Sequence, residues 1–282
     1  MKRVVTGVIA AGSATAAVLY LPPLLFWLVA TAMVLVAAAE YAALVRRIAV
    51  SPATLRWVLW LSIGFVALAD GVRSQTITLP LPFDPVDLDR PVGAGAVILA
   101  LAVVIALCGR ASMRDRLTAS TLFVFGTLWL GLFLVATMGL YRVDPLLLFW
   151  VLAVAAIGDV GAFYGGRAFG RRPVAPLISP KKTIAGTVSG LVASVAVGVG
   201  AFLLWRGPDA FGPGIPVVAL ICGGSAQVGD LVASMVKRAA DVEDTGRLLP
   251  GHGGLIDRLD SLTLTAPMLY VAVELGAIPS LA

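Results

Sequence analysis

Residues 145–166 have the sequence PLLLFWVLAVAAIGDVGAFYGG, an almost unbroken apolar run with one carboxylate, Asp159. The hydrocarbon core of a bilayer is about 30 Å thick, so a helix needs about 20 apolar residues to cross it. This run is long enough, and similar runs recur along the chain. A carboxylate inside such a helix is costly and is therefore a candidate functional group. The stretch predicts a membrane-spanning helix that carries Asp159 near its inner end.

The composition extends this prediction to the whole chain. The 282 residues are 59% hydrophobic and 13% charged, with a mean hydropathy of +0.97. A soluble domain is nearer half apolar and a quarter charged, so the fold class is predicted to be an all-α polytopic membrane protein. The net charge of +5 is explained by basic cytoplasmic loops, and no nucleic-acid partner is expected. Cys108 and Cys222 lack metal-ligand spacing and are interpreted as packing residues.

Apolar length predicts about nine transmembrane helices. The N-terminal run is interpreted as a retained helix and not a cleaved signal, because further apolar spans follow at once. Pro and Gly clusters separate several of the spans. The candidates are residues 4–20, 24–45, 55–70, 92–109, 117–140, 145–166, 184–205, 214–236 and 262–281.

Loop charges predict the orientation. With the N-terminus inside, alternating spans place 17 of the 21 Lys and Arg residues on the cytoplasmic side and leave the C-terminus outside. The protein is thus expected in the inner (cytoplasmic) membrane as a multi-pass protein, with its site facing the cytoplasm. Residues 1–91 are expected to form three helices and an external loop, and residues 92–282 a catalytic region.

A basic segment at 167–183 follows Asp159. Lys181 and Lys182, flanked by Ser179 and Thr183, stand just before an apolar helix. Two lysines, two hydroxyls and a helix N-terminus can together bind a polyphosphate. The alternative is a basic loop that sets topology and touches anionic lipid headgroups.

A second polar segment, residues 225–261, contains the only histidine, His252, within the glycine-rich stretch 249–254. Glycines allow close backbone approach to a ligand. On a helix that continues to about residue 240, one face would carry alternating charges that suit a metal ion and a phosphate. That face comprises Asp230, Ser234, Lys237, Arg238 and Asp241.

Asp257 and Asp260, spaced i,i+3, share a face at the start of the last helix. Carboxylates that converge from different helices form a hard-oxygen site suited to Mg²⁺. The alternative is that these acids only cap the helix. A single histidine and unclustered cysteines argue against zinc, and neither a nucleophile elbow nor a nucleotide-binding glycine motif is present.

These residues resemble the signature of the phosphatidate cytidylyltransferases, the CDP-diacylglycerol synthases, over roughly residues 100–282. The specific C-terminal part comprises Ser234-x-x-Lys237-Arg238, Asp244, Leu249-Pro250-Gly251-His252-Gly253-Gly254 and Asp257-Arg258-x-Asp260. The upstream part comprises Asp159-x-Gly161-Ala162-Phe163-x-x-Gly166-Arg167 and Ser179-Pro180-Lys181-Lys182-Thr183.

The resemblance implies an enzyme that condenses phosphatidic acid with CTP to give CDP-diacylglycerol and pyrophosphate. It also implies Mg²⁺, K⁺ as a candidate second cation, and a homodimer in lipid. The implied metal ligands are Asp230, Asp257 and Asp260, which with Lys237 form the implied catalytic set. The implied nucleotide and phosphate contacts are Asp159, Ser179, Lys181, Lys182, Thr183, Arg238, Asp244, His252, Gly253 and Gly254.

Three positions depart from the family pattern. Ala185 and Ala233 stand where the family usually has glutamate, and Glu243 stands where it usually has lysine. The hypothesis is that Glu243 partly compensates in cation binding. The alternatives are the same chemistry on another lipid phosphate, a CTP-dependent lipid kinase, a catalytically silent paralogue, or an anion transporter, although a transporter should place its charges nearer the bilayer midplane.

Overall fold

The computed structural model describes residues 15–49, 55–74, 76–77, 100–101, 104, 111–208, 212–246 and 253–278. Five helices in these ranges are long and apolar enough to cross a membrane. They are α2 (Pro23–Ile48), α5 (Met113–Val143), α6 (Leu146–Phe169), α7 (Ile184–Arg206) and α8 (Gly214–Ala239). The chain is therefore an all-α polytopic membrane protein, which confirms the prediction from composition.

Most predicted spans in the described ranges coincide with helices. The five long helices and α3 (Leu55–Arg73) begin and end within a few residues of their predicted limits. The predicted spans 4–20 and 92–109 lie largely outside the described residues. The count of nine spans and the orientation of the termini therefore stay predictions.

The last predicted span, 262–281, is wrong in length. Helix α10 (Leu262–Glu274) has 13 residues, or about 20 Å at 1.5 Å per residue, which is too short to cross a bilayer. Gly276, with φ 67°, ends it in a left-handed turn. The Gly276 N–H donates to Val273 O and the Ala277 N–H to Ala272 O, the Schellman pattern that closes a helix.

The chain forms two compact units. The first comprises Met1–Val135 and Ala239–Asp257, and the second comprises Ala136–Arg238 and Arg258–Ala282. The domain boundary predicted at 91/92 falls outside the described residues and stays a prediction.

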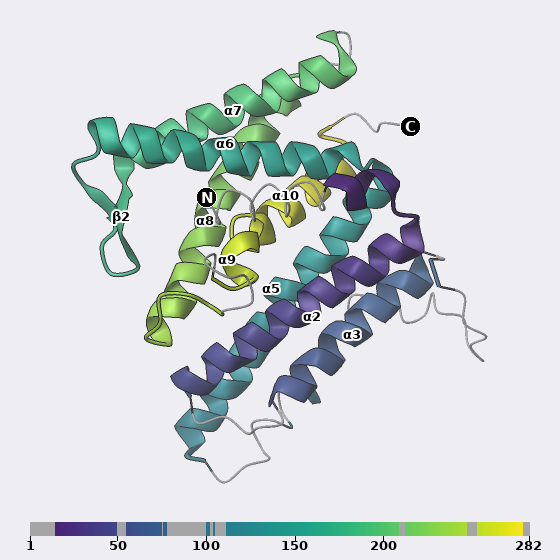
Figure 1. The fold of residues 1–282 in the computed structure, drawn as a ribbon, viewed down its shortest axis with the longest axis vertical. Coiled ribbons are helices and arrows are strands. Elements are labelled where there is room, and N and C mark those ends of the chain that lie inside the picture. The colour runs from purple at the N-terminus through teal and green to yellow at the C-terminus, as the bar shows by residue number, and fades with distance from the viewer. Residues whose placement is uncertain are drawn as a thin grey trace. The chain divides into compact units, whose positions relative to one another are not determined.

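In the first unit, α2 lies alongside α3 (Figure 1). Tyr41 of α2 is 1% exposed, and its hydroxyl donates to the Leu122 carbonyl oxygen of α5 at 2.7 Å. Gly126 of α5 faces the Tyr41 ring, where a Cβ would overlap the ring carbons. A glycine is therefore required at this crossing of α2 and α5.

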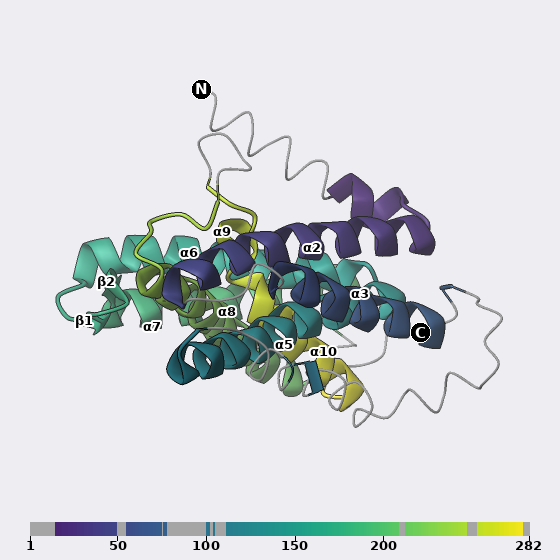
Figure 2. The same cartoon turned by 90° about the horizontal axis from the view of Figure 1, so that it is seen from below.

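In the second unit, α6 and α7 run side by side (Figures 1 and 2). Small residues bring the two backbones together, as is common between membrane helices. Gly158 of α6 lies against Ser194 of α7, and Ser194 Oγ donates to the Val154 carbonyl oxygen at 3.0 Å. Farther along, Trp150 Nε1 donates to the Gly198 carbonyl oxygen at 2.8 Å.

A short hairpin connects α6 to α7. Strands β1 (Pro173–Ala175) and β2 (Ser179–Thr183) pair antiparallel, with Pro173 opposite Thr183. Thr183 also caps α7, because its Oγ1 accepts from the Gly186 N–H at 3.2 Å. The Ser-Pro-Lys-Lys-Thr motif is thus a strand fixed to a helix N-terminus.

Candidate active site

Helix α8 carries a row of polar side chains in the second unit. Asp230 and Ser234 lie one turn apart, and Ser234 Oγ donates to Asp230 Oδ1 at 3.4 Å. Lys237 and Arg238 follow in the last turn of the helix. The prediction that Asp241 continues this face is wrong, because α8 ends at Ala239 and Asp241 has φ 54°.

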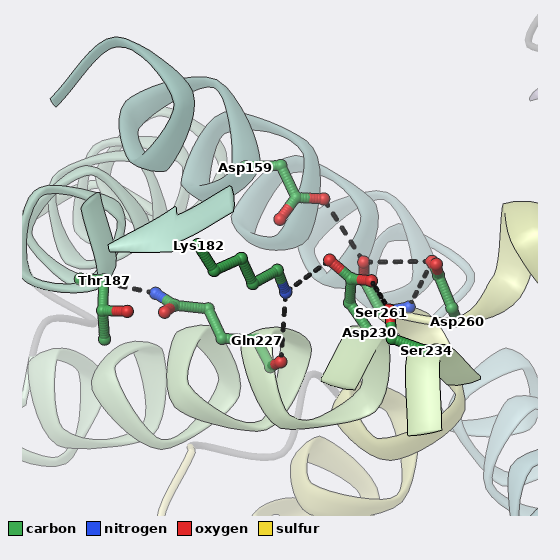
Figure 3. A network of polar contacts seen from close by, with 8 residues as sticks. All are labelled: Asp159, Lys182, Thr187, Gln227, Asp230, Ser234, Asp260 and Ser261. Carbon is green, nitrogen blue, oxygen red and sulfur yellow. Dashed lines mark hydrogen bonds and ion pairs between the residues drawn. The ribbon is translucent and has the colours of Figure 1, made fainter. Parts of the chain in front are cut away.

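Lys182 connects strand β2 to this row of side chains (Figure 3). Its Nζ forms an ion pair with Asp230 Oδ2 and lies 3.5 Å from the Gln227 carbonyl oxygen. The Gln227 side chain donates from Nε2 to the Thr187 carbonyl oxygen of α7 at 3.0 Å. Only 28% of the Lys182 side chain and 27% of the Asp230 side chain are exposed, so each charge depends on the other for compensation.

Ser261 connects two further carboxylates, Asp159 of α6 and Asp260 (Figure 3). Its Oγ lies 3.3 Å from an oxygen of each, and its N–H donates to Asp260 Oδ1 at 2.7 Å. Burial, followed by the neighbouring Asp230 carboxylate, raises the pKa of Asp260 to about 6. The Ser261 N–H and the Lys237 charge oppose this rise. Asp159, Asp230 and Asp260 therefore form one cluster with incomplete charge compensation.

A cavity of about 680 Å³ opens beside the cluster, within the usual range for small-molecule sites. Helices α6 and α8 and the junction of β2 with α7 line it. The charged and hydroxyl side chains among its lining are Asp159, Arg167, Lys181, Lys182, Thr183, Thr187 and Asp230. The structure thus brings together basic residues and acids from two segments that are distant in the sequence.

Other predicted residues of the second unit lie near the hairpin. Arg238 Nε donates to the Ile178 carbonyl oxygen at 3.4 Å and so joins the end of α8 to the residue before β2. Ser179 pairs with Ala175 at the start of β2, at the other end of the strand from Thr183. Arg238 and Ser179 therefore support the hairpin, while Lys181, Lys182 and Thr183 line the cavity.

Asp257 lies in the first unit, where it binds Thr245 and Gly254. Its Oδ2 accepts from the Thr245 N–H at 2.8 Å, from Thr245 Oγ1 at 2.9 Å and from the Gly254 N–H at 3.0 Å. Gly253 has φ 78°, and a Cβ there would lie 2.8 Å from Asp257 Oδ2 and 3.2 Å from Asp244 Oδ1. His252 lies outside the described residues.

Glu40 and Gln227 are absent from the sequence prediction. Glu40, the only acid in α2, accepts from the Leu255 N–H at 2.9 Å and from the Ile256 N–H at 3.0 Å. A lone carboxylate in an apolar helix is a signal that could have found Glu40. Gln227 gives no comparable signal, because its importance depends on the approach of Lys182.

Carboxylate and hydroxyl oxygens are the ligands that Mg²⁺ prefers, so the acid cluster has the right types of ligand atom for this ion. Among the described residues, however, no three carboxylate, histidine or thiol side chains converge on one point as metal ligands. The assignment of Asp230, Asp257 and Asp260 to a metal therefore stays a prediction.

The three departures from the family pattern occupy different surroundings. Ala233 is 1% exposed in α8, so a glutamate here would be buried. Ala185 is half-buried in the first turn of α7. Glu243 is exposed in the segment after α8, and its compensating role stays a hypothesis.

The fold and site define a polytopic membrane protein with a cavity that combines cationic and acidic side chains. The model of the cytidylyltransferase family matches residues 1–275, and the chain belongs to this family.

Its relatives include proteins named phosphatidate cytidylyltransferase. The Brucella suis protein is 42% identical over 130 residues, 46% of this chain and 47% of the relative. The Synechocystis protein is 44% identical over 133 residues, covering 46% and 44%. The Haemophilus influenzae protein is 36% identical over 135 residues, covering 45% and 46%. The chain spans about half the length of the curated relatives it matches.

Proposed function

We propose that the protein transfers the cytidylyl group of CTP to phosphatidic acid and releases pyrophosphate, giving CDP-diacylglycerol. One observation carries the proposal: the Lys181–Lys182–Thr183 strand and the acids of α6 and α8 line one cavity. The names of the Brucella, Synechocystis and Haemophilus relatives support this reaction and this substrate.

The cationic part of the cavity suits a triphosphate. Arg167, Lys181 and Lys182 supply positive charge, and the N-terminus of α7 adds backbone N–H groups. Arginine binds phosphate oxygens through several donors, whereas lysine acts as a point charge. We assign these residues to CTP.

In the transfer, an oxygen of the lipid phosphate attacks the α-phosphorus of CTP. A new P–O bond forms at the α-phosphorus. The bond between the α-phosphorus and the oxygen that bridges it to the β-phosphorus breaks, and pyrophosphate leaves with the electron pair. A phosphate monoester is already ionised near pH 7, so no strong general base is needed. The protein contributes mainly by positioning and charge neutralisation. Mg²⁺, held by the acid cluster, would neutralise phosphate charge when bound.

A membrane lipid and a soluble nucleotide must both reach such a site. We therefore propose that the cavity opens to the cytoplasm from the inner membrane, which the distribution of basic residues supports. A homodimer and a K⁺ ion are parts of the same proposal that rest on the family resemblance alone.

The test uses purified protein with phosphatidic acid vesicles and CTP labelled at either the α- or the γ-phosphate. Label from the α position alone should enter lipid, only with Mg²⁺, and Asp230→Asn should lower the rate by about 100-fold or more. Glu274→Ala, at an exposed acid of α10, is the control and should keep full activity.

Each other outcome has a distinct meaning. Lipid labelled from the γ position would show a CTP-dependent kinase and contradict the proposal. If product forms with a different lipid phosphate but not with phosphatidic acid, the acceptor is that other lipid and the proposed substrate is wrong. CTP binding without any product would indicate a silent paralogue.

A further inference from the structure

Glu40 lies in an apolar helix, yet its carboxylate is directed at a segment more than 200 residues away in the sequence. Oε1 accepts from the Leu255 N–H at 2.9 Å, and Oε2 accepts from the Ile256 N–H at 3.0 Å. Thr245 Oγ1 lies 3.2 Å from Oε2. All these residues belong to the first unit.

Two glycines fit this contact closely. A Cβ on Gly246 would lie 2.5 Å from Glu40 Oε1, and a Cβ on Gly254 would lie 2.5 Å from Glu40 Oε2. Real Cβ atoms do not approach an oxygen so closely, so the segment packs on the carboxylate only where it lacks side chains. The contact is thus formed by particular residues on both sides.

The short helix that follows Leu255 depends on partners outside itself. Helix α9 (Ile256–Leu259) has four residues, and so short a helix is not stable by itself. Its first N–H groups have no partner within the helix. Glu40 supplies acceptors for two N–H groups at this end, Leu255 and Ile256.

Thr245 extends the effect of Glu40 to Asp257. The Thr245 hydroxyl lies 2.9 Å from Asp257 Oδ2 and 3.2 Å from Glu40 Oε2, so one side chain touches both carboxylates. Asp257 also accepts the Gly254 N–H, directly before Leu255. Loss of the Glu40 carboxylate would therefore loosen the groups that orient Asp257.

We propose that Glu40 is a positioning residue that holds residues 245–246 and 253–257, and with them Asp257, in a fixed arrangement. The ordering role stands on the hydrogen bonds alone, whereas its importance for turnover rests on the proposed function. A carboxylate is required because it accepts at both oxygens. A glutamine accepts at only one, so either Leu255 or Ile256 would lose its partner.

The experiment combines hydrogen–deuterium exchange with kinetics on the full-length protein in nanodiscs. In Glu40→Ala, which removes the acceptors of both Leu255 and Ile256, peptides covering residues 253–259 should exchange about 10- to 100-fold faster than in the wild type, about tenfold for each lost hydrogen bond. Glu40→Gln should give an intermediate value, and Glu274→Ala should match the wild type.

In the same samples, kcat for CDP-lipid formation should fall about tenfold or more in Glu40→Ala and less in Glu40→Gln. The KM for CTP should stay unchanged, because Glu40 is not among the residues that line the cavity. A merely structural role would lower the amount of active protein without this graded fall in kcat.

Unchanged exchange at 253–259 would overturn the ordering role. Faster exchange with unchanged kcat would overturn the positioning role in turnover. If the wild type yields no product with any lipid but Glu40→Ala still exchanges faster at 253–259, the ordering role is supported and the proposed function is contradicted. Should Glu40→Ala fail to accumulate, Glu40→Gln alone carries the same test.

Discussion

At the residue scale, the Lys182–Asp230 ion pair connects the two motif segments. The family resemblance implies a phosphate contact for Lys182 and a metal ligand for Asp230, and the structure places the two side chains in an ion pair. The ammonium therefore compensates the carboxylate. In the proposed reaction, binding of CTP and Mg²⁺ would supply each of them with a new partner.

Lys182→Met removes the ammonium and keeps an unbranched side chain. We expect kcat/KM for CTP to fall about 10- to 100-fold, the effect of losing one charged hydrogen bond. Lys182→Arg keeps the charge and should retain more activity. Steady-state kinetics with labelled CTP measures both variants. If Lys182→Met has the same kcat/KM as the wild type, Lys182 does not bind CTP.

Asp260 predicts a pH dependence of stability. Its pKa in the folded protein is about 6, above the ordinary 3.8, so between these values the folded state binds the proton more tightly than the unfolded state. The stabilisation is complete below pH 3.8 and is lost as the pH rises through 6.

The measurement is thermal unfolding in EDTA at pH 5 and pH 7.5. The Tm of the wild type should fall between these values by more than the Tm of Asp260→Asn. Equal falls in the two proteins would show that Asp260 has an ordinary pKa.

At the scale of elements, the contact between α6 and α7 positions the cavity. Gly190 of α7 faces α6 so closely that a Cβ would lie 2.9 Å from the Gly158 carbonyl oxygen and 2.9 Å from Gln227 Nε2. Gly200, ten residues farther along α7, has no atoms within 4 Å of the same position. A side chain therefore fits at Gly200 but not at Gly190, although both glycines belong to α7.

Gly190→Ala should destabilise the protein by about 1–3 kcal/mol, because it separates two backbones and displaces the Gln227 amide. Gly200→Ala should be neutral or slightly stabilising, since it replaces a helical glycine in open space. Unfolding of both variants in detergent gives the comparison, and equal stabilities would contradict the close packing at Gly190.

At the scale of the whole molecule, the predicted orientation makes α7 cross from the cytoplasm to the outside. Leu177, in the turn of the hairpin before α7, is 91% exposed, and Pro208 is exposed just after the helix. Because α7 has 23 residues and is apolar enough to cross a membrane, these two positions should lie on opposite sides of the membrane.

Single cysteines at these positions test the orientation in a Cys108→Ala, Cys222→Ala background. Leu177→Cys should react with a membrane-impermeant maleimide only in inside-out vesicles. Pro208→Cys should react only in right-side-out vesicles. The opposite pattern would invert the topology, and labelling of both from one side would show that α7 does not cross.

The membrane class and most of the helix limits within the described ranges could be predicted from the sequence, which also supplied the candidate residues of the site. Each of these depends on local properties, namely apolar length, helix-breaking residues and the spacing of charges within one segment. The length of α10 was predicted wrongly. Its sequence stays apolar beyond Glu274, but the helix ends there because Gly276 adopts a left-handed turn.

Which side chains meet could be learned only from the folded arrangement of the helices. The ion pair of Lys182 with Asp230, the bridge of Ser261 between Asp159 and Asp260, and the bonds of Glu40 to Leu255 and Ile256 join residues from distant segments. Spacing along one helix cannot predict them, because they follow from the close approach of separate helices. Glycines permit that approach at the α6–α7 contact and at the contact of Glu40 with Gly246 and Gly254.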